Sequence, residues 1–169
     1  TEYALIDLQL SGITDILVLQ GDKCKVDANT APAKCGNRYA IDLQRQVNRF
    51  NEGFFVDGTP IKEPGQPFSY GVACYPEKHE EAPNMESDLA VLKQKADEGA
   101  AYAVTQMFFD NSKYFAFVER ARAMGINIPI IPGIKPIHRM SQINILPKTF
   151  RVDLPTELVT ELLKCKDDT

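Results

Sequence analysis

The sequence predicts an α/β fold in which parallel strands alternate with amphipathic helices. Three stretches follow the same order: a helix with apolar residues at helical spacing, a glycine, and a short run rich in β-branched and aromatic residues. These runs are largely apolar rather than alternating, as expected of parallel strands that are buried on both faces. Strands and helices that alternate in this way indicate a parallel sheet or barrel.

The predicted strands cover residues 16–19, 70–75, 102–109 and 128–133. The predicted helices cover the start of the chain to residue 11, then 39–50, 84–98, 110–124 and 154–164. Asn84 is the expected N-cap of the third helix, and Pro155 lies near the first turn of the last one. Three helices end at glycine, which adopts the left-handed conformation of a helix end without steric cost: Gly12, Gly99 and Gly125.

The number of strands limits the architecture. A complete barrel of eight strands and eight helices needs about 250 residues, and this chain has 169. With four predicted strands, the chain is either a small open sheet or about half of a barrel. We expect one domain over residues 1–169. We also expect it to be cut out of a longer protein, because Thr1 lies inside the first predicted helix and neither Met nor a signal peptide precedes it.

Composition excludes two classes of partner. Hydrophobic residues make up 44% and charged residues 25%, the ordinary balance of a globular protein. The net charge is −4 and no basic stripe is present, so we expect no nucleic acid partner. No apolar stretch approaches the roughly 18 residues that span a bilayer, so we expect no membrane partner. A cytoplasmic location fits both expectations.

The cysteines carry no metal motif. Cys24, Cys35, Cys74 and Cys165 are spread along the chain without CxxC spacing. Cys24 and Cys35 flank a polar loop and could pair or bind a metal, but no second pair of zinc ligands accompanies them. We therefore favour free thiols in a reducing cytosol and predict no metal site.

Each predicted strand ends in polar residues or in residues with special backbone properties. These are Gln20, Gly21 and Asp22 after the first strand, Tyr75 to His79 after the second, Thr105, Gln106 and Asp110 at the third, and Pro132 and Gly133 at the fourth. Sites in parallel α/β proteins form at the carboxyl ends of the strands. We place the candidate site there.

Several of these polar residues have two interpretations. An amide in an apolar strand needs hydrogen-bond partners, so Gln106 either belongs to a structural network or faces a ligand. Asp22 is either a turn residue or a negative charge aimed at a cationic or donor-rich ligand. His79 is either a capping residue or a ligand contact. Asp88 and Lys95, seven residues apart on one side of a helix, are typical of a solvated charged face.

Taken together, several motifs resemble the methylenetetrahydrofolate reductase family. The most specific are the run from Ala103 to Asp110 and the run from Pro129 to Ile137. Gly21-Asp22, the run from Tyr75 to His79 and the helix with Asp88 and Lys95 agree as well. The resemblance implies a (β/α)8 barrel that binds FAD at its carboxyl face, of which this chain holds strands four to seven. It also implies that NADH or NADPH reduces FAD, which then reduces 5,10-methylenetetrahydrofolate to 5-methyltetrahydrofolate.

The resemblance assigns roles to single residues. Asp22 matches a catalytic aspartate near the flavin and the pterin, which favours the cationic iminium form of the folate. Three residues match substrate contacts: Asp22, Gln106 and Gln142. The residues that match FAD contacts are Gly21, Asp22, Tyr39, Ala40, Tyr75, His79, Asp88 and Lys95. Lys95 is expected near the cofactor phosphates and Asp88 near the adenosine ribose.

The chain departs from the family pattern at several positions. Gln20 and Gln94 stand where the family has basic residues, and Val91 stands at an amide position. Two guanidinium groups that could bind phosphate are thereby lost, which weakens the expected hold on FAD. The loop over residues 23–38 also differs. The glutamate that the family uses as general acid lies on the first barrel strand, which this chain lacks.

Three functions follow as hypotheses. The first is the carboxyl-side half of an FAD-dependent methylenetetrahydrofolate reductase, inactive in isolation. The second is a non-catalytic half-barrel that associates with itself or with a separate half, because two open sheet edges attract partners. The third is a related flavin or folate enzyme with another one-carbon substrate. We expect a homo-oligomer in addition to the small-molecule partners.

Overall fold

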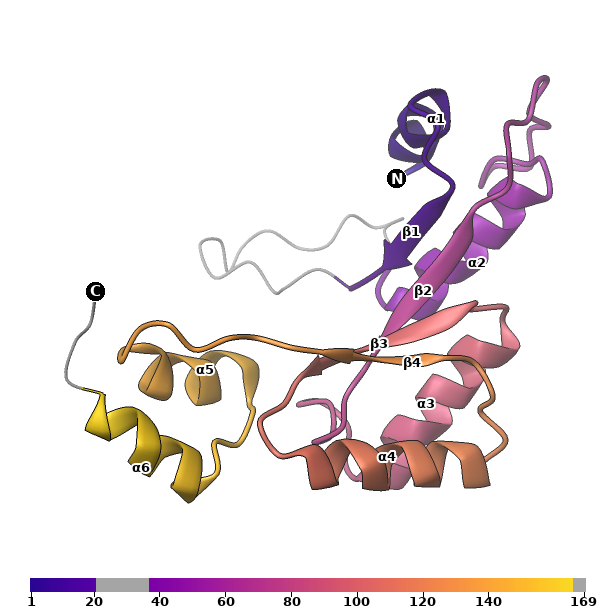
Figure 1. The fold of residues 1–169 in the computed structure, drawn as a ribbon. Helices are drawn as coiled ribbons and strands as arrows, with labels where there is room; N and C mark the ends of the chain where they lie inside the picture. Colours follow the sequence, from indigo (N-terminus) through magenta and orange to yellow (C-terminus); the bar gives the residue numbers. More distant parts are fainter. Residues whose placement is uncertain (21–36, 166–169) are drawn as a thin grey trace. The chain divides into compact units, whose positions relative to one another are not determined.

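The computed structural model describes residues 1–20 and 37–165. Its strands are β1 (Asp15–Val18), β2 (Ser69–Cys74), β3 (Tyr102–Met107) and β4 (Ile130–Gly133). Its helices are α1 (Glu2–Leu10), α2 (Ala40–Asn51), α3 (Met85–Asp97), α4 (Asn111–Ala123), α5 (Gln142–Phe150) and α6 (Thr156–Lys164). The strands form one sheet in the order β1-β2-β3-β4, in which β1 is parallel to β2 and β3 is parallel to β4 (Figure 1).

This order confirms the predicted fold class. Consecutive parallel strands that follow one another in space, with helices between them, are the arrangement found within a (β/α)8 barrel. The four strands make it a partial barrel. The chain divides into two compact units: Thr1–Ala73 with Lys95–Tyr102, and Cys74–Gln94 with Ala103–Thr169.

The first unit is built on α2 and on the strands β1 and β2. Asn51, at the end of α2, fixes the start of β2 because its side chain donates to the Phe68 carbonyl over 2.9 Å and accepts the Phe68 N–H over 2.8 Å. Phe50 packs on Phe68, with 6.1 Å between the ring centroids. The buried apolar residues of this unit are Leu5, Val18, Ala40, Val47, Phe50, Phe68, Tyr70, Val72 and Ala100.

The second unit is built on β3, β4 and α4. The Tyr114 hydroxyl donates to the Ile130 carbonyl over 2.9 Å, which joins α4 to β4. The Tyr114 ring also stacks on Phe108 at 5.1 Å. The buried apolar residues of this unit are Cys74, Leu89, Leu92, Ala103, Phe117, Ala121, Ile126, Ile130, Leu146 and Val152.

The predicted helix ends are confirmed. Gly12, Gly99 and Gly125 follow their helices with φ values of 74°, 103° and 74°. The Asn84 side chain accepts the Ser87 N–H over 2.8 Å and so caps α3 as expected. None of the helices that the structure describes is long and apolar enough to cross a membrane.

Two strand predictions were wrong in detail. The third strand ends at Met107 rather than at 109, because Asp110 already caps α4 by accepting the Ser112 N–H. The fourth begins at Ile130 rather than at 128, and Pro129 just before it has no N–H to donate to a sheet. Burial on both faces holds for β2 but not for the outer strands, since Leu17 of β1 is 42% exposed and Ile131 of β4 is 45% exposed.

One helix was not predicted. Residues 142–150 form α5 although Pro147 lies inside it. Proline in a helix interior removes a hydrogen bond and normally argues against a helix. Here Leu146 is buried at 3% exposure, and its burial favours the helix. Tertiary packing therefore outweighs local propensity in this segment.

Candidate functional site

The loop after β2 brings three of the predicted site residues together. The rings of Tyr75 and His79 meet edge to face, with 4.6 Å between their centroids and an angle of 72°. The backbone N–H of His79 donates to Oδ2 of Asp88 over 2.8 Å. The second unit therefore holds Tyr75, His79 and Asp88 in one cluster.

Asp88 is buried, although its position on the helix indicated a solvated side chain. Its side chain lies in the first turn of α3 and is buried, at 9% exposure. A buried carboxylate needs hydrogen-bond donors, and the His79 N–H is one of them. The helix dipole also favours a negative charge at this end of α3. The interpretation of Asp88 as part of a solvated face was wrong.

Four further hydrogen bonds hold this loop. The Glu81 N–H donates to Nδ1 of His79 over 3.2 Å, and the Ala82 N–H donates to the His79 carbonyl over 3.1 Å. Lys78 has a φ of 77°, a left-handed conformation that is uncommon for a residue other than glycine. Its ammonium donates to the His79 carbonyl over 2.8 Å and to the Ala82 carbonyl over 2.6 Å. Sequence reasoning gave Lys78 no role.

Gln106 lies at the carboxyl end of β3 and is half-buried. Its Oε1 accepts the N–H of the next residue, Met107, over 2.9 Å. Its Nε2 makes no hydrogen bond to any residue between 1 and 20 or between 37 and 165. The side chain is thus satisfied at one end by its own backbone, and it presents the amide nitrogen as a donor.

The backbone next to Gln106 is closely packed against β4. The Gly133 N–H donates to Oγ1 of the buried Thr105 over 2.8 Å, and the pairing between the two strands shifts register between Val104 and Met107. A Cβ at Gly133 would lie 2.2 Å from the Thr105 carbonyl oxygen. Only glycine fits at this position, so the predicted end of the fourth strand is fixed by a close backbone approach.

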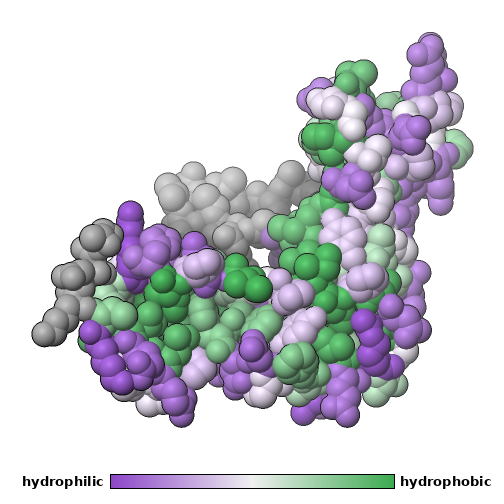
Figure 2. Space-filling view, viewed as in Figure 1, coloured by the Kyte–Doolittle hydropathy of each residue, from purple (hydrophilic) through white to green (hydrophobic). Residues whose placement is uncertain are grey.

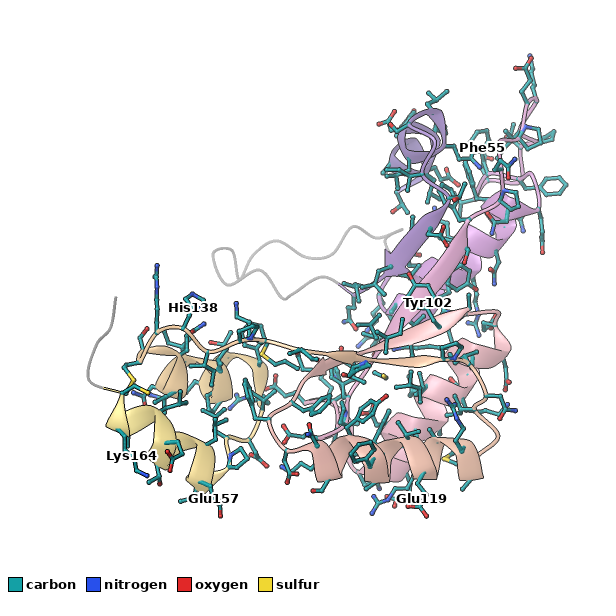
Figure 3. The ribbon with its side chains drawn as sticks, in the orientation of Figure 1. Phe55, Tyr102, Glu119, His138, Glu157 and Lys164 are labelled. Atoms are coloured by element: carbon teal, nitrogen blue, oxygen red, sulfur yellow. The ribbon has the colours of Figure 1, made fainter. Side chains whose placement is uncertain are left out.

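Gln142 is the first residue of α5. Its Oε1 accepts two backbone hydrogen bonds, from the His138 N–H over 2.9 Å and from the Arg139 N–H over 3.0 Å. His138, on the loop before α5, is exposed (Figure 3). Gln142 therefore orders this loop, and its amide nitrogen is the part of the side chain that remains for a ligand.

The other described residues that the resemblance assigns to the cofactor, Lys95, Tyr39 and Ala40, lie in the first unit. Lys95 donates from Nζ to the Ala73 carbonyl over 3.2 Å, and its own carbonyl accepts the amide of the buried Gln44 over 3.0 Å. Tyr39 is the N-cap residue of α2, and its N–H donates to the Asp42 carboxylate over 2.9 Å. Ala40 is buried directly after it.

Other predicted positions lie outside the described residues or at the surface. Gly21, Asp22, Cys24 and Cys35 lie outside the described residues. At the positions where the family pattern is lost, the side chains of Gln20, Val91 and Gln94 are all exposed. In the parts of the chain that the structure describes, no three His, Cys, Asp or Glu side chains group closely enough to hold a metal ion.

Glu77 is a residue of this region whose role sequence reasoning missed. Its Oε1 accepts from the Lys113 ammonium over 2.7 Å, and its Oε2 accepts the Asp153 N–H over 2.9 Å. Lys113 also pairs with the Asp153 carboxylate. Burial alone lowers the pKa of Lys113, but the hydrogen bonds from Asp153 and Glu77 outweigh it and raise that pKa above 10.5. The position of Glu77 at the carboxyl end of a strand was the available signal.

Comparison with known proteins identifies the family. The family model for methylenetetrahydrofolate reductase matches residues 1–169. "Methylenetetrahydrofolate reductase 1" of Schizosaccharomyces pombe is 36% identical over 94% of this chain and 24% of its own length. "5,10-methylenetetrahydrofolate reductase" of Pectobacterium carotovorum is 36% identical over 89% of this chain and 43% of its own length. The chain thus spans about a quarter of the yeast protein and less than half of the bacterial one.

A solved structure is similar as well. It is that of an uncharacterized protein from Clostridium thermocellum that binds two copies of 5-methyl-5,6,7,8-tetrahydrofolic acid. The TM-score is 0.49 at 14% identity, over 99% of this chain and 72% of that one. This likeness is too weak to argue from, so the assignment rests on the match to the family model. On that match, the chain belongs to the methylenetetrahydrofolate reductase family.

Proposed function

We propose that this chain is the part of a methylenetetrahydrofolate reductase barrel that binds FAD and the folate substrate. The observation that carries the proposal is the match of the family model to all 169 residues. The cluster of Tyr75, His79 and Asp88 supports it, because three residues that the resemblance assigns to one cofactor contact one another.

The chemistry of the described side chains fits a dinucleotide cofactor. Phosphate groups need positive charge or N–H donors, which Lys95 and His79 can supply. Ribose hydroxyls need acceptors, which the Asp88 carboxylate can supply. Flavin rings need flat apolar neighbours, and Tyr75 is one. The exposed Gln94 and Val91 offer no charge, so the hold on the phosphates rests more heavily on Lys95.

The folate is proposed to meet Gln106, Gln142 and Asp22. Both glutamines use their side-chain oxygen on nearby backbone N–H groups, so both present an NH₂ donor to a substrate. Pterin rings carry carbonyl and ring-nitrogen acceptors that suit such donors. A carboxylate at Asp22 stabilises the positive charge of an iminium.

The overall reaction moves a hydride from NADH or NADPH to 5,10-methylenetetrahydrofolate and yields 5-methyltetrahydrofolate. A bound FAD supplies the two-electron carrier between the two substrates. Names of relatives specify NADPH for the Caenorhabditis elegans protein and NADH for the Arabidopsis thaliana protein. We propose either nicotinamide for this chain. We further propose that residues 1–169 are one partial barrel domain and that the general acid is supplied by the rest of the barrel.

The test joins this chain to the remaining barrel strands of a relative. The purified protein is examined for bound flavin by visible absorption, and then for oxidation of NADH and NADPH in the presence of 5,10-methylenetetrahydrofolate. We expect a yellow, active protein, and no turnover from the chain alone. A colourless and inactive product of the joined protein would refute the proposal.

A second function, association without catalysis, is favoured by the sheet edges. Leu17 of β1 and Leu19 just after it are 42% and 48% exposed, and Ile131 of β4 and Ile134 just after it are 45% and 80% exposed. Apolar side chains, coloured green, are visible at the surface in Figure 2. Such edges pair with further strands. Light scattering of the chain alone tests this: oligomers support association, and monodisperse monomers contradict it.

A further inference from the structure

One ring nitrogen of His79 accepts a hydrogen bond from the backbone of its own loop. This nitrogen, Nδ1, lies 3.2 Å from the Glu81 nitrogen and accepts the hydrogen of that N–H. A ring nitrogen that accepts a hydrogen bond carries no proton, so in the neutral ring the proton is on Nε2. No residue described here accepts from Nε2. The ring therefore presents one N–H donor to whatever binds beside it.

The ring is also fixed in orientation. The Tyr75 ring meets it edge to face at 4.6 Å, which limits rotation about the Cβ–Cγ bond. The Glu81 N–H holds Nδ1. A ring contact and a hydrogen bond together restrict the direction in which Nε2 points.

The backbone that carries this ring is held by Asp88. Oδ2 of Asp88 accepts the His79 N–H over 2.8 Å, and the ammonium of Lys78 donates to the His79 carbonyl over 2.8 Å. Lys78 itself is in the left-handed region, with a φ of 77°. Backbone in that region persists where surrounding contacts over-determine it. Asp88 provides the contact from outside the loop, because it belongs to α3.

We propose that Asp88 is a positioning residue for His79: it holds the His79 backbone where the Glu81 N–H meets Nδ1, which leaves Nε2–H to donate to an oxygen of the bound cofactor. The inference rests on the proposed function, because it needs a cofactor with exposed oxygens, such as a phosphate or ribose oxygen of FAD. It goes beyond a direct contact of Asp88 with the ribose. In this role Asp88 acts through the His79 backbone.

The first experiment needs no cofactor. The chain has two histidines, His79 and the exposed His138, so ¹H–¹⁵N imidazole spectra of the 169-residue chain contain two spin systems. We expect His79 to show the Nε2–H form alone and His138 to show an average of the two forms. A His79 ring protonated on Nδ1 would overturn the proposal.

Two variants of Asp88 distinguish its role as a hydrogen-bond acceptor from its negative charge. Asp88→Asn keeps an oxygen that can accept the His79 N–H, so we expect the His79 signals to stay in place. Asp88→Ala removes the acceptor, so we expect these signals to move toward averaged values like those of His138. Glu86→Gln, in the same first turn of α3, is the matched control and should change neither ring. Unchanged His79 signals in Asp88→Ala, or loss of the Nε2–H form in Asp88→Asn, would contradict positioning. If Asp88→Ala does not fold, the wild type and Asp88→Asn still decide.

The second experiment uses the joined protein and FAD. Gln offers an amide donor at a similar reach to Nε2, so His79→Gln should bind FAD within a few-fold of wild type, whereas His79→Ala should bind about tenfold more weakly. The Nε2–H resonance of His79 should shift when FAD binds. FAD binding that leaves this resonance unmoved would overturn the inference and leave the proposed function intact. A wild-type protein that binds no FAD would overturn the proposed function, and with it the cofactor contact of His79.

Discussion

The carboxylate of Glu77 joins two segments that are far apart in the sequence: one oxygen accepts from the Lys113 ammonium over 2.7 Å and the other accepts the Asp153 N–H over 2.9 Å. The side chain of Glu77 is 10% exposed, whereas that of Asp153 is 78% exposed. Glu77 is therefore the buried centre of the network. It fixes the loop after β2 to α4 and to the segment before α6, within the unit that also holds His79.

Glu77→Gln should destabilise the chain by about 1–2 kcal/mol in urea unfolding, because a charge-assisted hydrogen bond to a half-buried ammonium becomes a neutral one. Glu80→Gln is the matched control. Glu80 pairs with Arg151 over 3.2 Å, but both side chains are more than 60% exposed, and such pairs contribute less than about 1 kcal/mol. Equal losses from the two variants would contradict the special role of Glu77.

The same network predicts a dependence on alkaline pH. The pKa of Lys113 is raised in the folded chain, so its pairing stabilises fully below the ordinary value of 10.5 and is lost as the pH rises through the higher folded value. The difference in unfolding free energy between wild type and Lys113→Met should thus be constant from neutral pH to about 10 and shrink above it. Urea titrations at several pH values measure this. A difference that grows with pH would refute it.

Asp110 predicts the opposite dependence, at acid pH. Hydrogen bonds from the Ser112 side chain and backbone lower the pKa of Asp110 below its ordinary value of 3.8. The cap therefore stabilises α4 above that value and is lost as the pH falls through the lower folded value. Asn at position 110 caps the helix without a charge, so its cap does not titrate. Between pH 5 and pH 2 the melting temperature of Asp110→Asn should therefore fall less than that of wild type. Thermal melts of both proteins, with Asp110→Ala as the uncapped reference, test it.

Gly71 of β2 predicts a steric effect inside the first unit. A Cβ built there lies 2.2 Å from Cε2 of Tyr102, the labelled residue at the start of β3 in Figure 3. Gly71→Ala should destabilise the chain by about 1–3 kcal/mol through overpacking. Tyr102→Leu removes the ring, so the double variant should lose less than the two single variants add up to. Additive losses would show that the ring does not cause the clash.

Sequence reasoning reached the alternation of strands and helices because its signals are local. Glycine stops and the Asn84 cap each act within one turn of a helix, so they can be found without knowing the fold. The helix α5 was missed because its local signal, Pro147, is unfavourable and its stability comes from packing that the sequence does not display.

In the site, too, local features could be predicted and features that depend on packing could not. The grouping of Tyr75 with His79 follows from their spacing of four residues on one loop. The burial of Asp88 could not be predicted, because helical spacing places it beside Lys95 but does not tell which protein groups cover that face. Likewise, an amide in a strand predicts a need for partners, but not that Gln106 satisfies its oxygen on the Met107 N–H.

In both Gln106 and Gln142 the side-chain oxygen accepts backbone N–H groups and the NH₂ group is left for a ligand, which leads to the last prediction. In Gln142 the side-chain oxygen accepts the His138 and Arg139 N–H groups, so Gln142→Glu keeps the acceptor and replaces the NH₂ donor by a second oxygen. The exchange rates of the His138 and Arg139 amides should stay near wild type in Gln142→Glu and rise in Gln142→Ala. Affinity of the joined protein for the folate should fall about tenfold in both variants, since both lose the donor.

Gln106→Glu offers the same comparison at the other amide, where Oε1 accepts the Met107 N–H. We expect the exchange of the Met107 amide to be unchanged and the folate affinity to fall by a similar factor, because a carboxylate repels the carbonyl and ring-nitrogen acceptors of a pterin. If Gln142→Glu and Gln106→Glu bind the folate as wild type does, the NH₂ groups do not contact the substrate. Both glutamines then serve only the backbone that they are seen to hold.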